Sequence, residues 1–87
     1  MTENLINDDV VVDLASPYVC LGRLVAMHEQ YLELRDADLH DLRDTRTSRE
    51  NYVVSAVQTG IKRNRKTVFV SMRDVVAIAR LSDVVID

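Results

Sequence analysis

Residues 18–35 read YVCLGRLVAMHEQYLELR, and this stretch decides the fold. Apolar and β-branched residues fill Tyr18–Glu29, which predicts a long strand. A tight turn near His28–Gln30 leads into Tyr31–Arg35, where apolar and polar residues alternate as in a half-buried strand. Gly22 lies inside the first strand, and a lone glycine in a strand marks a bulge, a sharp bend or a close backbone approach. The stretch therefore predicts two successive strands, with one of these three features at Gly22 in the first.

Three more strands are predicted on either side of this pair. Asp9–Leu14 contains the run VVVDL and ends before Ser16-Pro17. Thr67–Ser71 (TVFVS) and Val75–Leu81 (VVAIARL) are separated by a tight polar turn, Met72-Arg73-Asp74. Five short strands are too few for a two-sheet sandwich, but they can close into a small, strongly bent barrel that removes most exposed edge. The predicted fold class is mainly β.

The segment between the third and fourth strands predicts a loop and one helix. Residues 36–46 (DADLHDLRDTR) are charged and show no period, so they are expected to form a loop. The helix is expected over 48–59, with a capping box between Thr47 and Glu50 and with Gly60 just past its end. Its apolar stripe consists of Val53, Ala56, Val57 and Ile61. The adjacent valines at 53 and 54 would suit a strand equally well.

The length of 87 residues predicts a single domain over 1–87. A domain of this size is marginally stable, and such domains often gain stability from disulfides, metals or oligomers. Cys20 is the only cysteine and the chain has two histidines, so a disulfide is excluded and a structural zinc site is not expected. Oligomerisation therefore remains as the expected source of additional stability. The net charge of −3 gives no overall attraction to nucleic acid or membrane, so any nucleic-acid site must be local.

A cytoplasmic location is expected. Met1–Asp9 is acidic and polar, whereas a secretory signal is basic and then apolar. No apolar run approaches the roughly 20 residues of a membrane span. The single thiol of Cys20 agrees with a reducing compartment.

The spacing of these residues resembles the Sm-like (LSm) superfamily, which includes the bacterial RNA chaperone Hfq. The first motif of that family has alternating apolar residues, then G-x-L, three residues, an Asp and a third apolar strand. Gly22 and Leu24 match G-x-L, and His28 falls at the position of the Asp. The apolar positions are matched by Val10, Val12, Leu14, Tyr31, Leu32 and Leu34.

The second motif of the family is an apolar residue, Arg-Gly and two spaced apolar residues. Val70 takes the apolar position, Ser71-Met72 replaces Arg-Gly, and Val75 and Ile78 keep the spacing. The resemblance covers about 9–36 and 67–81. Residues 37–66 depart from it as a variable region with an inserted helix, and the usual N-terminal helix looks truncated or absent.

The resemblance implies a homo-oligomeric ring of roughly five to seven subunits. Family members assemble by pairing the fourth strand of one subunit with the fifth strand of the next, which here are Val68–Ser71 and Val75–Leu81. A free apolar strand edge in a soluble protein needs such a cover.

The resemblance also implies single-stranded RNA binding at two turns on the pore side. Carried over by position, the contact residues are His28, Tyr31, Leu32, Ser71 and Met72, and Arg73 could supply the charge that Ser71 lacks. The alternative is that these residues only pack in a pore without an RNA site, and that the protein is an assembly or protein-interaction module.

We call Lys62, Arg63, Arg65 and Lys66 the basic segment. Repeated around a ring it would hold phosphates, and the alternative is a solvated loop.

No residue pattern predicts an enzyme, a cofactor or a bound metal. Four acids, Asp36, Asp38, Asp41 and Asp44, lack the Gly, Asn and terminal Glu of a calcium loop. His28-Glu29 does not start an HExxH zinc motif, because Leu32 occupies the second histidine position. The two glycines form no phosphate loop, and no catalytic triad is evident.

Overall fold

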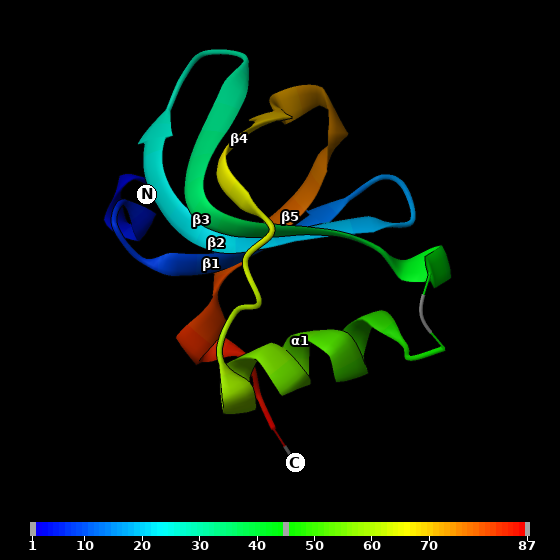
Figure 1. Cartoon of the computed structure of the whole chain (residues 1–87). Coiled ribbons are helices and arrows are strands. Elements are labelled where there is room, and N and C mark those ends of the chain that lie inside the picture. The colour runs from blue at the N-terminus through cyan, green and yellow to red at the C-terminus, as the bar shows by residue number, and fades with distance from the viewer. Residues whose placement is uncertain (1, 45, 87) are drawn as a thin grey trace.

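The computed structural model describes residues 2–44 and 46–86 as five strands and one α-helix (Figure 1). Their bounds are β1 Asp9–Leu14, β2 Tyr18–Met27, β3 Tyr31–Asp41, α1 Arg49–Thr59, β4 Arg65–Ser71 and β5 Val75–Arg80. The strands form one antiparallel sheet in the order β4-β3-β2-β1-β5. The prediction of a mainly β fold with a helix between the third and fourth strands is confirmed.

The sheet curls strongly because β2 and β3 bend in the middle. Their pairing register shifts between Leu21 and Arg23, next to Gly22. A Cβ atom at Gly22 would lie 2.9 Å from the Cβ and 3.0 Å from the Cα of Ala37, which is fully buried. The predicted bulge and close approach at Gly22 are therefore confirmed.

Gly22→Ala is expected to destabilise the chain by about 1–3 kcal/mol, because the added methyl group overlaps Ala37 in a packed core. Chemical denaturation of the single variant measures the loss. The matched control is Gly22→Ala combined with Ala37→Gly, which removes the closest clashing atom and should recover part of the stability. An unchanged denaturation midpoint in the single variant would contradict this account of the bend.

Two apolar cores lie on opposite faces of the sheet. The barrel interior holds Val10, Val12 and Leu14 of β1 together with residues of β2, β3 and β4. The second core lies between the sheet and α1, where Val11 of β1 packs near Val53 of the helix. Because β1 is covered on both faces, its sequence is a nearly continuous apolar run rather than an alternation.

The prediction of a loop over 36–46 is wrong for residues 36–41, because β3 continues to Asp41. The charged residues of this segment form a strand because their backbone pairs with β2, from Leu21↔Asp38 to Tyr18↔Asp41. Of the rest of that range, Leu42–Asp44 forms a 3-10 turn and Thr45 lies outside the described residues.

The predicted capping box at α1 is also wrong. Ser48 is the N-cap residue, and its Oγ accepts a hydrogen bond from the backbone N–H of Asn51 at 3.1 Å. Gly60 follows the helix with φ of 92°, a conformation that glycine adopts without strain, so this part of the prediction holds. At the N-terminus, the described residues show a 3-10 turn over Thr2–Leu5. None of the described helices is long and apolar enough to cross a membrane.

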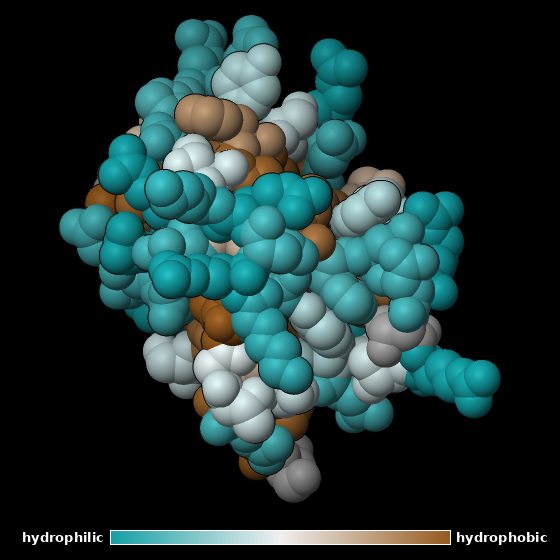
Figure 2. Space-filling view, in the orientation of Figure 1, coloured by the Kyte–Doolittle hydropathy of each residue, from teal (hydrophilic) through white to brown (hydrophobic). Residues whose placement is uncertain are grey.

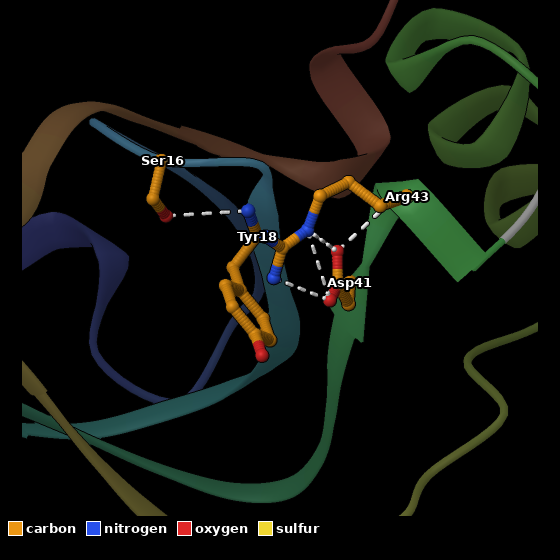
Figure 3. A network of polar contacts seen from close by, with 4 residues as sticks. All are labelled: Ser16, Tyr18, Asp41 and Arg43. Atoms are coloured by element: carbon orange, nitrogen blue, oxygen red, sulfur yellow. Dashed lines mark hydrogen bonds and ion pairs between the residues drawn. The ribbon is translucent and has the colours of Figure 1, made fainter.

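A polar contact at the end of β3 fastens it to the β1–β2 turn (Figure 3). The Arg43 guanidinium donates to both carboxylate oxygens of Asp41, at 3.0 Å from Nε and 2.8 Å from Nη2, and lies 6.0 Å from the Tyr18 ring centroid. The backbone N–H of Leu42 donates to the carbonyl of Pro17 at 2.8 Å. These contacts fix where β3 ends.

Acid is expected to weaken this contact. Side-chain and backbone hydrogen bonds from Arg43 lower the pKa of Asp41 from 3.8 to about 2. A carboxyl group with a lowered folded-state pKa stabilises the fold above its unfolded pKa, and this stabilisation is lost as the pH falls from about 4 through 2. Asp41→Asn should flatten the fall of thermal stability across that interval. An identical slope in both proteins would contradict the assignment.

Candidate nucleic-acid interface

The β3–β4 pairing brings the two predicted turns together. Tyr31 is paired with Ser71, and the backbone N–H of Met72 donates to the carbonyl of Gln30 at 2.9 Å. The backbone N–H of His28 donates to the carbonyl of Tyr31 at 2.8 Å, which closes the β2–β3 turn. Residues some forty positions apart in the sequence thus form one surface at the upper end of the barrel in Figure 1.

Exposed aromatic rings lie on this surface. The Tyr31 and Phe69 rings meet edge to face, with centroids 6.4 Å apart, and the His28 ring lies 6.4 Å from Phe69. Tyr31 is 48% exposed, Phe69 57% and Met72 38%, so large apolar groups face solvent here. In Figure 2, apolar surface shows among polar groups over the upper part of the molecule, where β4 and the two turns lie. Exposed ring faces of this kind can stack on bases.

Phe69 was not among the residues predicted from the sequence. Val70 points into the barrel, so strand alternation places Phe69 on the outer face, where it is paired with Glu33. The alternation of apolar residues in TVFVS contained this signal.

Leu32 must be removed from the predicted contacts. Its side chain is 1% exposed in the barrel core, where it is paired with Val70, and it cannot reach a ligand. Its neighbours in the strand, Tyr31 and Glu33, point to the other face, because strand side chains alternate. We call the remaining surface the turn cluster, which consists of His28, Tyr31, Phe69, Ser71, Met72 and Arg73.

The polar groups of the turn cluster are held in place. His28 Nε2 lies 3.0 Å from Glu33 Oε1, and this hydrogen bond is the main cause of a lowered Glu33 pKa. Ser71 Oγ accepts from the backbone N–H of Arg73 at 3.3 Å, which leaves the hydroxyl proton available to a ligand. Arg73 has no acidic partner among the described residues, so its charge is available as well.

The basic segment lies at the opposite end of β4 from the turn cluster. Arg65 starts β4 and Ser71 ends it, so the two are about 20 Å apart at 3.3 Å per residue. Arg63 Nη1 already donates to Asp36 Oδ1 at 2.9 Å. The predicted phosphate contacts and the predicted base contacts therefore do not form one site within a subunit.

A buried polar group joins α1 to the sheet. Asp38 is 3% exposed, and it accepts hydrogen bonds from the hydroxyl of Tyr52 and from Asn64 Nδ2. The Tyr52 ring stacks on His40, with centroids 4.0 Å apart. Burial and the bond to Asp38 raise the pKa of Tyr52. The two hydrogen bonds give Asp38 a structural role, because they satisfy its buried carboxylate. The described residues contain no cluster of three or more metal-ligating side chains.

Cys20 lies in the barrel core. Its side chain is fully buried, and burial together with the nearby Asp38 charge raises the pKa of its thiol to about 12. A thiol with this pKa stays protonated and is a poor nucleophile. Cys20 therefore acts as a small buried hydrophobic residue of the barrel core.

No protein-family model matches the sequence, and no curated protein matches it either. A solved structure does match, the Pyrococcus abyssii Sm protein in complex with a uridine heptamer. The match covers 90% of this chain and 89% of that chain, with a TM-score of 0.61. The chain has the Sm fold. At 18% sequence identity, the likeness concerns the fold, and the Sm motif spacing predicted from the sequence agrees with it.

Proposed function

We propose that this Sm-fold protein is a non-enzymatic, cytoplasmic RNA-binding subunit of a homo-oligomeric ring. The observation that carries the proposal is the turn cluster, in which two turns present exposed aromatic rings, a free hydroxyl proton and a free guanidinium on one surface. The similar Sm protein was solved with a uridine heptamer, which supports single-stranded RNA as the ligand.

The sheet order supports the ring. Among the described strands, β4 is paired only with β3 and β5 only with β1, so each has one unpaired edge. Val76 on β5 is 67% exposed and Phe69 on β4 is 57% exposed, so apolar side chains accompany both edges. Joining β4 of one copy to β5 of the next covers both edges. Repetition of this contact, which we call the seam, would close a ring of roughly five to seven subunits.

The chemistry of the turn cluster suits single-stranded RNA. Tyr31 and Phe69 offer ring surface to bases, and each stacked base contributes about 1–3 kcal/mol. The Ser71 hydroxyl can donate to a base edge, and Arg73 can hold a phosphate. In a ring each subunit contributes one such surface, so several nucleotides of one strand are bound at once.

The direct test is fluorescence anisotropy of labelled uridine heptamer titrated with the purified protein at low salt. We expect saturable binding that weakens as salt is raised, because phosphate contacts release counterions. Adenosine and cytidine heptamers serve as comparisons for base preference. Failure to bind any of these homopolymers at low salt would overturn the proposal.

A second candidate is an Sm-fold assembly or protein-interaction module. It is favoured by the net charge of −3 and by His28, Ser71 and Met72, which stand where the family has Asp and Arg-Gly. Under this function the ring would form and bind none of the three heptamers.

A further inference from the structure

We propose that Arg65 and Lys66 of one copy lie against an acidic hollow at the end of β5 in a second copy, and that this contact fixes the register of the seam. The inference rests on the proposed ring. It assigns these two cations to a protein partner instead of RNA phosphate, and the partner is a second copy of this chain.

The acidic half of the contact is a hollow beside the end of β5. Its volume is about 580 Å³, and it is lined by Asp8, Asp9, Val57, Arg80, Leu81 and Ser82. Arg80 Nε donates to Asp8 Oδ2 at 2.8 Å, and Arg80 Nη1 lies 3.7 Å from Asp83 Oδ2. Arg80 thus pairs with two carboxylates, those of Asp8 and Asp83, while the carboxylate of Asp9 also lines the hollow, so negative charge remains in excess.

The basic half lies at the start of β4. Arg63 and Arg23 both contact Asp36, at 2.9 Å and 3.8 Å, so this carboxylate is already shared. Arg65 and Lys66 are exposed, and neither has an acidic partner within the described part of the chain. Each copy therefore carries unpaired positive charge at the start of β4 and an excess of carboxylates around the end of β5 and the start of β1.

Antiparallel pairing matches these two halves. The first residue of one strand lies opposite the last residue of its partner, so Arg65 at the start of β4 meets Arg80 at the end of β5. Arg80 is already paired with Asp8 and Asp83, and the excess carboxylate charge around it is what attracts Arg65 and Lys66. The strands have 7 and 6 residues, so their apolar centres align when their charged ends align. A shift by one residue would turn every side chain of the joining strand to the other face, and complementary charges select against such errors.

The test is a charge swap read by light-scattering mass in the full-length protein at low salt. Arg65→Glu with Lys66→Glu places like charges at every seam, and so does Asp9→Lys with Asp83→Lys. Each pair is expected to weaken assembly at least about tenfold in the protein concentration needed. The variant with all four changes restores opposite charges and should regain the native mass. Asp8 is left unchanged because it makes the closer contact with Arg80 within its own chain, at 2.8 Å against 3.7 Å for Asp83.

Circular dichroism of each variant checks that the monomer is folded, and uridine heptamer binding is measured in parallel. Loss of assembly in both two-residue variants with recovery in the four-residue variant supports the inference. A full ring mass in the Arg65→Glu, Lys66→Glu variant overturns it, and weakened heptamer binding by that ring would return these residues to a phosphate role. A monomeric wild-type protein would refute the proposed ring itself, which is a different result from an unaffected ring.

Discussion

Ile78→Asp is expected to leave no folded, assembled protein. Ile78 is paired with Val12 between β5 and β1 and packs against the barrel core. Burial of an unpaired carboxylate costs several kcal/mol. The whole chain is expected to have a stability of about 4–13 kcal/mol, from 0.05–0.15 kcal/mol per residue. Circular dichroism and light-scattering mass should together show either an unfolded chain or a monomer.

The Val76→Asp variant distinguishes an effect on the seam from an effect on the core. Val76 is 67% exposed on the same strand, so a carboxylate there costs the monomer little. In the proposed ring it would lie beside the next subunit's β4. We expect a folded protein with the mass of a single chain. If both aspartate variants kept the mass of the wild-type assembly, the assignment of β5 to the seam would be wrong.

Tyr31→Ala is expected to weaken binding of a uridine heptamer by about 5- to 150-fold, which corresponds to the loss of one stacked base at 1–3 kcal/mol. The Tyr31 ring is 48% exposed and meets the Phe69 ring edge to face, so its removal leaves His28 as the remaining ring beside Phe69. Fluorescence anisotropy at fixed salt measures the change. Phe69→Ala should weaken binding in the same direction.

Tyr31→Phe is the matched control, because it keeps the ring and removes only the hydroxyl. Its affinity should stay close to that of the wild-type protein if stacking is the main contribution. Circular dichroism is expected to be unchanged in both variants, since Tyr31 lies outside both apolar cores. Equal affinities for wild-type, Tyr31→Ala and Phe69→Ala proteins would remove the turn cluster from the RNA site.

The sequence predicted those parts of the fold in which apolar spacing and backbone chemistry agree. The β1 strand and the bend at Gly22 are of this kind, because a run of β-branched residues and an isolated glycine each have few structural solutions. The second half of β3 was mistaken for a loop. Asp38 is accommodated in the strand by hydrogen bonds from Tyr52 and Asn64, which are distant in the sequence, and sequence spacing does not reveal such partners. Asp41 is bonded by Arg43, only two residues further along the chain.

The candidate site was only partly predictable. The motif positions led to both turns, and the structure places Tyr31 and Ser71 opposite each other. The same positional transfer included Leu32, whose place on the inner face followed from the alternation around it. Phe69 was missed because it stands outside the motif positions, although that same alternation points it outward.

The ring is tested most directly by light-scattering mass on the protein eluting from a sizing column, with absorbance read at 260 and 280 nm. The chain has three Tyr and no Trp, so its own absorbance is weak and bound nucleic acid is easily detected. We predict a mass several times the 9.9 kDa of one chain, together with excess absorbance at 260 nm when RNA copurifies. A mass of 9.9 kDa at all protein concentrations would contradict the account.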